Sequence, residues 1–329
     1  MTSFAHIINP VRVGRESDLY TAQPITFQSV RHAKAFAAGR HDVQLYSVQY
    51  AEDSDAVPDG FVRTPDLERS ILDLRQFRKP RKLPLIRDII SRGLDAQPDA
   101  DFYIYSNADI GLMPHFYLSV GRILESGVEA LAINRKTVPS YYTSTNELPD
   151  IYAEPGVPHE GIDCFVFANA QMARLYFADA IIGSGPVGLC FVTNMLVVAT
   201  RLLWLEHKDL TFHIGDDKSW TNPILSDYET HNFQQLQCIA HHFTGDVSSP
   251  HNVAKREFLE SVLHFCQHKN SGPHFQIHPK SLLREVSAME DYSDSALRRL
   301  RVRRRPSTIF GLPRAVSRAL GRYLPATMK

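Results

Sequence analysis

The first 135 residues alternate between short apolar stretches and longer segments in which apolar side chains recur at helical spacing. The stretch "FAHIINPV" (4–11) predicts a buried strand that ends at Asn9-Pro10, and "TAQPITFQSVRHAKAFAAG" (21–39) predicts a helix. "DVQLYSVQY" (42–50) then alternates as a second strand. This order predicts the start of a doubly wound sheet, and we expect its strands to be parallel as far as about residue 135.

Later segments predict further helices and strands. "LERSILDLRQF" (67–77) and "LPLIRDIISRGLDA" (83–96) predict two helical pieces, and "EALAINRKTV" (129–138) predicts another strand. Residues 139–161 have the turn residues of a long loop before a strand at 162–168. The apolar run "FVTNMLVVATRLLWLEH" (191–207) predicts one long helix.

The composition bounds the class of protein. With 43% hydrophobic and 22% charged residues, and no apolar run of about eighteen residues, the 329-residue chain is typical of a globular protein without a membrane span. The start "MTSFAHIINPV" lacks the basic and apolar regions of a signal peptide, and the four scattered cysteines form no CxxC pair. We therefore expect a cytoplasmic protein with reduced thiols.

Asn107 and Asp109 follow the apolar strand "FYIYS" (102–106) and stand two positions apart. Ligands of open α/β sheets bind outside the carboxyl ends of the strands. If the backbone stays extended, both side chains face the same side, so that their oxygens can reach one Mg²⁺ or Mn²⁺ ion on a diphosphate. The alternative is that Asn-Ala-Asp only ends the strand in a turn.

Two later segments offer further chemistry. Asp163 precedes the apolar strand "CFVFA", where it could orient an acceptor hydroxyl or act as a general base. His213 ends another strand and precedes Gly215, Asp216 and Asp217, a set that could complete a metal shell or form an acid/base pair. The alternatives are a turn aspartate, a packing histidine and a solvated Asp-Asp turn.

Two common motifs are missing from the sequence. It contains no GxxxxGK[ST] and no GxSxG. Their absence argues against a P-loop enzyme and an α/β-hydrolase.

The segments "NPV", "YIYSNADIGL", "GIDCFVF" and "HIGDDKSW" make residues 4–245 resemble the GT-A fold glycosyltransferases, the nucleotide-diphospho-sugar transferase superfamily. The resemblance implies an α/β fold with a single doubly wound mixed sheet flanked by helices, in a catalytic domain over residues 1–245. Residues 246–296 are then a helical extension, and 297–329 a basic tail. The implied activity transfers a sugar from a nucleotide-sugar donor to a glycan, lipid-linked or small-molecule acceptor.

The resemblance also assigns roles by position. Asn107 and Asp109 correspond to the DxD pair that holds Mn²⁺ or Mg²⁺ on the diphosphate, and His213 resembles a further metal ligand. Asn107 stands where the motif has its first aspartate, so it offers less charge to a metal. Asp163 resembles the acceptor-side carboxylate, with Asp216 and Asp217 as further catalytic candidates. The nucleotide is expected beside the ends of the first two strands, at Asn9, Pro10, Glu52 and Asp53.

The chain ends in a strongly basic segment. Residues 297–329 contain nine arginines, one lysine and no acidic residue, although the whole chain has no formal net charge. From 313 to 324 the spacing allows a helix with Arg314, Arg318 and Arg322 on one face, which predicts peripheral contact with an anionic membrane surface. The alternative is a solvated tail, or one docked on the acidic body. Nucleic acid is less favoured, because no recognised nucleic-acid module accompanies the charge.

Two other functions stay open at this point. A sugar nucleotidyltransferase would need a glycine-rich loop with Lys or Arg after the first strand, and "NPVRVGRES" is a poor version of it. A non-catalytic nucleotide-sugar or glycan binding protein on the same fold would be compatible with Asn107 in place of an aspartate.

Overall fold

The structure is a computed structural model that describes residues 1–206, 208–215, 223–247 and 252–268. Every described residue belongs to one compact unit, Met1–Met289, and the second unit, Glu290–Lys329, lies outside the described residues. The catalytic candidates Asp216 and Asp217 and the basic tail also lie outside them.

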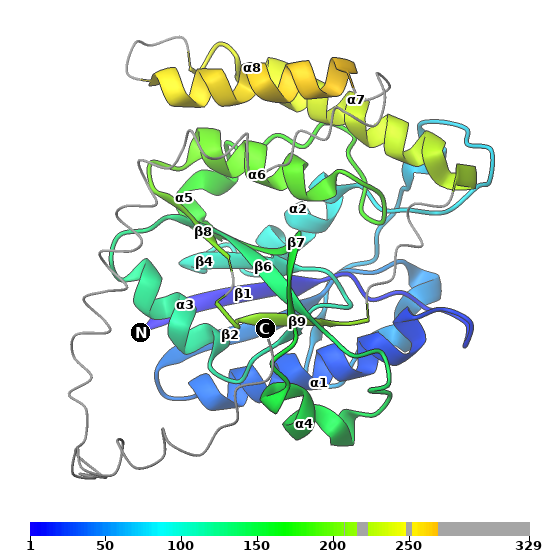
Figure 1. Cartoon of the computed structure of the whole chain (residues 1–329), viewed down its shortest axis with the longest axis vertical. Coiled ribbons are helices and arrows are strands. Elements are labelled where there is room, and N and C mark those ends of the chain that lie inside the picture. The colour runs from blue at the N-terminus through cyan, green and yellow to red at the C-terminus, as the bar shows by residue number, and fades with distance from the viewer. Residues whose placement is uncertain (207, 216–222, 248–251, 269–329) are drawn as a thin grey trace, which may run out of the picture. The chain divides into compact units, whose positions relative to one another are not determined.

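The elements follow one another as strands and helices in alternation over the first half of the chain (Figure 1). The strands are β1 (Thr2–Ile8), β2 (His41–Ser47), β3 (Val62–Arg63), β4 (Phe102–Ser106), β5 (Gly111–Leu112), β6 (Ala130–Val138), β7 (Val157–Ala168), β8 (Leu202–Leu205) and β9 (Thr211–Ile214). The helices are α1 (Leu19–Ala37), α2 (Ile86–Ala96), α3 (Phe116–Leu124), α4 (Leu148–Ala153), α5 (Asn169–Met172), α6 (Val187–Val198), α7 (Ser226–Phe243) and α8 (Val253–His268).

The strands form one mixed sheet in the order β3-β2-β1-β4-β7-β6-β9-β5, with β8 paired to β6. β1 to β4 are parallel, as the sequence predicts. β6 runs in the same direction as these strands, so the prediction of parallel strands up to residue 135 is wrong only for the two-residue β5, which is antiparallel to β9. β7 lies between β4 and β6 and is antiparallel to both. Strands that are consecutive in the chain can pair in this way without a crossover helix.

Alternate side chains of β1 enter two different cores. Ala5 and Ile7 pack in the core that contains α2 and α6, whereas Phe4 and Ile8 pack in the core that contains α1 and α3. This alternation is what a strand covered on both faces requires. Figure 1 shows the sheet between α1, α3 and α4 on one side and α2, α5 and α6 on the other.

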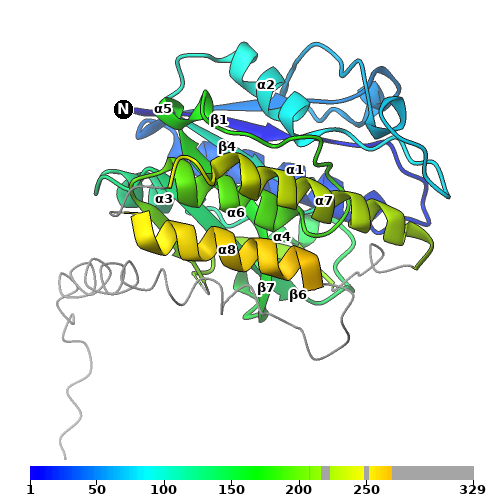
Figure 2. The ribbon, with the colours of Figure 1, turned by 90° about the horizontal axis from the view of Figure 1, so that it is seen from above.

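Helices α7 and α8 lie side by side beyond α6 (Figures 1 and 2). Phe258 and Leu259 of α8 are buried in the same core as α6. Lys255 Nζ donates to Val197 O at 3.0 Å and to Ala199 O at 2.9 Å, at the C-terminal end of α6. A cation is favourable there because the last carbonyl groups of a helix carry partial negative charge.

Two predicted helices are wrong. In 67–77 only Ile71–Asp73 forms a 3₁₀ turn, since the backbone of Ile71 bonds to Leu83 instead of continuing a helix. The run 191–207 is helical only to Val198, and its second half forms β8 along the free edge of β6. No helix in the described part of the chain has both the length and the apolar character needed to cross a membrane.

Candidate active site

Asn107 and Asp109 stand at the carboxyl end of β4 but do not continue the strand. The backbone N–H of Ile110 donates to Asn107 O at 3.1 Å, so residues 107–110 form a turn. The expectation that both side chains face one way on extended backbone is therefore wrong. Asn107 contacts Asp163, and Asp109 contacts His213.

Asn107 is bonded to Asp163 through both backbone and side chain. Its backbone N–H donates to Asp163 O at 3.1 Å, and its side-chain Nδ2 donates to Asp163 Oδ1 at 3.1 Å. Its side-chain oxygen accepts a hydrogen bond from the Tyr105 hydroxyl at 3.2 Å. Both ends of this amide are thus engaged by the protein, and the side chain orients Asp163.

Asp163 occupies a β-bulge between β7 and β6. Ile133 pairs with Cys164 and Asn134 pairs with Ile162, so Asp163 has no residue opposite it on β6. A bulge of this kind redirects a side chain out of the regular alternation of a strand. The bulge therefore explains how a residue inside a long strand points at the end of β4.

Arg135 of β6 is the second partner of Asp163, and it was not among the residues predicted from the sequence. Its Nη1 donates to Asp163 Oδ2, and the two side chains are only 12% and 13% exposed. Its Nε is buried and has no hydrogen-bond acceptor among the described residues. The available signal was the basic pair in "INRKTV", within a strand that begins with four apolar residues.

His213 and Asp109 form a second pair beside the first. His213 Nδ1 lies 2.7 Å from Gly215 O, and since a carbonyl oxygen only accepts, this nitrogen carries the proton. Nε2 lies 3.4 Å from Asp109 Oδ2, and the His213 side chain is 8% exposed. The second nitrogen is therefore directed at the carboxylate.

The pair shifts the titration of both groups. Burial opposes the charged form of His213, but the hydrogen bond and charge of Asp109 outweigh it and raise the pKa of the imidazole. Burial likewise opposes charge on Asp109, yet the hydrogen bond and charge of His213, with the charge of Arg135, lower the pKa of this carboxyl. The two groups are thus oppositely charged between their pKa values.

Tyr105 connects the two pairs. Burial raises the pKa of its hydroxyl, and the negative charges of Asp109 and Asp163 raise it further, so both carboxylates act on one group. Its ring stacks on Phe191 of α6 with centroids 5.2 Å apart and planes 9° apart. The structure therefore brings Asn107, Asp109, Asp163 and His213 together at the carboxyl end of β4, which we call the site edge of the sheet. The stacked rings of Tyr105 and Phe191 lie beside them.

The ends of β1 and β2 lie along the same edge, since β1 stands between β2 and β4. Asn9 Nδ2 donates to Val48 O at 2.6 Å, and the backbone N–H of Arg12 donates to Asp53 Oδ1 at 2.8 Å. Burial raises the pKa of Asp53, and the bond from Arg12 offsets only part of this. These bonds join the loop after β1 to the end of β2.

The other two predicted nucleotide contacts differ in exposure. Pro10 is buried next to Asn9. Glu52 is 54% exposed and pairs with Lys82, which also lies 4.0 Å from the centre of the Tyr50 ring. Of the two acidic candidates Glu52 and Asp53, only Asp53 is buried.

The arrangement of strands is found in solved structures. Residues 1–349 of TarS from S. aureus, in complex with UDP-GlcNAc, match with a TM-score of 0.51 and 11% identity, over 88% of this chain and 80% of that chain. TarS is a GT-A type glycosyltransferase. The chain has a GT-A-type nucleotide-diphospho-sugar transferase fold. The predicted fold class is confirmed.

Two other solved structures match this chain at lower TM-scores. Rv0371c from Mycobacterium tuberculosis H37Rv, in complex with manganese, has a TM-score of 0.34 and 14% identity, over 69% of this chain and 99% of that chain. A putative glucose-1-phosphate thymidylyltransferase from Bacillus anthracis has a TM-score of 0.40 and 8% identity, over 70% and 95%. No protein-family model matches the chain, and no curated protein is significantly similar to it in sequence.

Asp109 and His213, at the carboxyl end of β4, are side chains of the types that coordinate a divalent cation. They place a carboxylate and an imidazole side by side, and both are ligands that Mn²⁺ accepts. Mg²⁺ commonly takes only one or two protein carboxylates and completes its shell with water and substrate phosphates. No group of three or more His, Cys, Asp or Glu that could hold a metal occurs within the described ranges. The pair therefore fits part of a metal shell.

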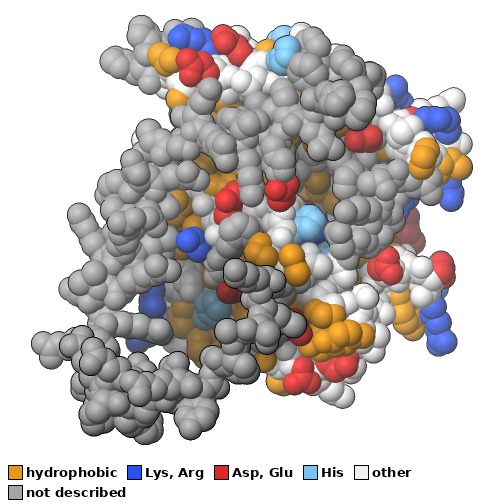
Figure 3. Space-filling model, in the orientation of Figure 1, with side chains coloured by type: hydrophobic (Ala, Val, Ile, Leu, Met, Phe, Trp, Pro, Cys, Tyr) orange, Lys and Arg blue, Asp and Glu red, His pale blue; other side chains and the backbone are white. Residues whose placement is uncertain are grey.

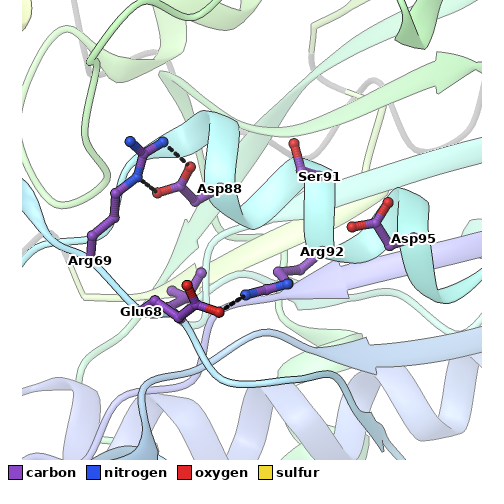
Figure 4. A pocket seen from close by; sticks show the side chains of 7 residues that line it. Glu68, Arg69, Asp88, Ser91, Arg92 and Asp95 are labelled. Carbon is purple, nitrogen blue, oxygen red and sulfur yellow. Dashed lines mark hydrogen bonds and ion pairs between the residues drawn. The ribbon is translucent and has the colours of Figure 1, made fainter.

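Charged side chains also line a pocket between α2 and residues 67–69, a segment that bonds to Gln49 and Tyr50 just after β2. The pocket has a volume of about 300 Å³ and is lined by Leu67, Glu68, Arg69, Asp88, Ser91, Arg92 and Asp95. Figure 4 shows that Arg69 pairs with Asp88, and that Arg92 pairs with Glu68. Both arginines are thus neutralised by neighbours, and the residues of the sheet edge are not part of the lining. We therefore place the candidate site at the edge.

Proposed function

We propose that this protein is a glycosyltransferase that moves a sugar from a nucleoside-diphosphate donor to an acceptor hydroxyl. The observation that carries the proposal is the joining of Asp109, His213, Arg135 and Asp163 at the carboxyl edge of a GT-A-type sheet. Acidic, basic and histidine side chains are also exposed close together near the middle of the face seen in Figure 3. Such a mixture suits a diphosphate leaving group and a hydroxyl nucleophile in one site.

The donor would lie along the ends of β1, β2 and β4. The buried carboxyl of Asp53, with Asn9 and Pro10 beside it, would take the nucleoside, and the diphosphate would then stand in front of Asp109. The UDP-GlcNAc bound by TarS makes UDP sugars the first donors to test.

A divalent ion, Mn²⁺ or Mg²⁺, would be held by Asp109 and His213. When bound, it would stabilise the negative charge that develops on the leaving diphosphate. The Nδ1–H bond from His213 to Gly215 fixes the ring so that Nε2 is the nitrogen available to a ligand. Asn107 would contribute by orienting Asp163, because its oxygen already accepts from Tyr105.

The acceptor hydroxyl would meet Asp163. Each carboxylate oxygen of Asp163 accepts one protein hydrogen bond, from Asn107 or Arg135, and a carboxylate has about four acceptor positions. Lone pairs therefore remain to orient a hydroxyl or to take its proton. Asp216 and Asp217 stay candidates for further carboxylates. A glycan or lipid-linked acceptor, and cytoplasmic action near a membrane through the basic tail, are parts of the same hypothesis.

The test is calorimetric titration of the full chain with UDP, GDP and UDP-GlcNAc, with and without Mn²⁺, joined to an assay of UDP release. Asp109→Ala should abolish nucleotide binding and leave the thermal transition in place. Asp95→Ala, an exposed aspartate on α2, is the matched control and should bind as the wild type does. Normal turnover by Asp109→Ala would show that the site is wrongly assigned, whereas a wild-type chain that binds none of these nucleotides and releases no UDP would overturn the proposed function.

Two other results would select the alternatives. Binding of a nucleotide sugar without release of its nucleoside diphosphate, for every acceptor offered, would favour a binding protein. Formation of a nucleotide sugar from a nucleoside triphosphate and a sugar phosphate would favour a nucleotidyltransferase.

A further inference from the structure

Arg135 is a largely buried arginine at the candidate site. It lies on β6 between β7 and β9, and its side chain is 12% exposed. One terminal nitrogen donates to Asp163 Oδ2, whereas Nε is buried without any acceptor in the described part of the chain. A buried N–H without a partner is costly, and native structures rarely keep one without a reason.

The charges around Arg135 suggest what its free donor could bind. Two carboxylates, Asp109 and Asp163, belong to the same site, and the charge of Arg135 acts on Asp109 as well as on its bonded partner. A diphosphate brought close to these carboxylates would be repelled unless a fixed cation stood there too. Arginine is always protonated and its fork-shaped head matches phosphate oxygens, so Arg135 is suited to that task.

We propose that Arg135 is a diphosphate-binding residue, in which Nε–H donates to a phosphate oxygen of the donor while the Nη1 bond to Asp163 is kept. The inference rests on the proposed function, and it adds that a protein cation binds the pyrophosphate group whether or not a metal is present. It also joins the donor phosphates to the acceptor-side carboxylate through one guanidinium group. Arg135 then positions Asp163 and binds the substrate at the same time.

The experiment compares a diphosphate with its nucleoside. Affinities for UDP and uridine, for GDP and guanosine, and for inorganic pyrophosphate are measured calorimetrically on the full chain, in EDTA and then with Mn²⁺. Arg135→Gln should weaken diphosphate and pyrophosphate binding at least tenfold in both buffers, with nucleoside affinity unchanged within about twofold. Arg122→Gln, at an exposed arginine in the last turn of α3 near the amino end of β2, should change none of these affinities.

The outcomes separate the inference from the function it rests on. Equal losses of diphosphate and nucleoside affinity in Arg135→Gln would mean a packing role and overturn the inference, as would unchanged diphosphate affinity. A wild-type chain that binds none of the probes would overturn both proposals. If Arg135→Gln lacks a cooperative thermal transition, Arg135→Lys serves instead, because it keeps the charge and loses the fork. It should weaken pyrophosphate binding but not nucleoside binding.

Discussion

Asn107 and Asp163 are joined by two hydrogen bonds of 3.1 Å, one from the backbone N–H of Asn107 and one from its side-chain amide. The first position of the predicted DxD-like motif is therefore directed at the bulge of β7, whereas the third position, Asp109, is directed at His213. An amide suits this place, because a carboxylate cannot donate to Asp163. If Asn107 stands for the first aspartate of that motif, as the resemblance implies, its contacts with Asp163 give the difference a structural reason.

Asn107→Asp should destabilise the protein and lower its activity. The substitution removes one donor and sets a second negative charge against Asp163, which we expect to cost about 1–3 kcal/mol. Chemical denaturation near neutral pH measures the loss, and Asn146→Asp, at an exposed asparagine, is the control. Tighter Mn²⁺ binding by Asn107→Asp with stability retained would show that this position is a metal ligand.

Gly161→Ala should damage the site more than the fold. A Cβ at this position would lie 2.8 Å from His159 Nδ1, 2.9 Å from Asp163 Oδ2 and 3.1 Å from Arg135 Nη1. The side chains of the ion pair must then move apart, and displacements of this size cost tenfold to a hundredfold in activity, roughly. Gly245→Ala meets nothing within 4 Å and should behave as the wild type. Full activity of Gly161→Ala would contradict the placement of this pair at the reacting centre.

The Asp109–His213 pair should make stability depend on pH. Because the folded pKa of His213 is raised, its contribution is complete below the unfolded value and is lost as pH rises through the folded value. Because the folded pKa of Asp109 is lowered, its contribution is lost as pH falls through that value. His213→Gln should therefore lose on the order of 1–2 kcal/mol near pH 6 and much less near pH 9.

Denaturation at several pH values, in EDTA, measures this difference. His241→Gln, at an exposed histidine near the end of α7, is the matched control and should show no such trend. A deficit of His213→Gln that stays constant from pH 6 to 9 would mean that the pair is not charged in the folded protein.

Lys255 should be important for the attachment of α8. Lys255→Met leaves the carbonyl groups of Val197 and Ala199 without their donor, and we expect a loss of about 1–3 kcal/mol. Arg256→Met, the next residue on the same helix, is the control and should change stability by less than about 0.5 kcal/mol. Thermal unfolding followed by circular dichroism distinguishes them. Equal behaviour of the two variants would show that the bonds of Lys255 contribute nothing.

Much of the sheet could be predicted from the sequence, because β1 and β4 are short, mostly apolar strands and β2 alternates between polar and apolar residues. The prediction of one long helix over 191–207 was wrong, because a continuous apolar stretch has no periodicity that distinguishes a helix from a strand. The second half of this run becomes a strand because it pairs with β6, and that neighbour exists only in the tertiary fold. The segment 67–77 is similar, because the backbone N–H of Ile71 bonds to Leu83 O, outside the segment, instead of to a residue within it.

The residues of the site were predictable as types, but their partners were not. Asp109 and His213 stand at strand ends, where the sequence places them, and the carboxyl ends of neighbouring strands meet at one edge. The contacts of Asp163 depend on a bulge and on an antiparallel strand between β4 and β6. Arg135 was missed because a basic residue in a strand is usually a solvated edge residue.

A crystal structure of the full chain with UDP and Mn²⁺ tests the central claim most directly. We predict the diphosphate at the carboxyl edge of β4, beside Asp109 and within hydrogen-bond distance of Arg135, with the base next to Asp53. A nucleotide bound elsewhere, such as in the pocket between Arg69 and Asp95, with the edge of β4, β7 and β9 unaltered, would contradict it.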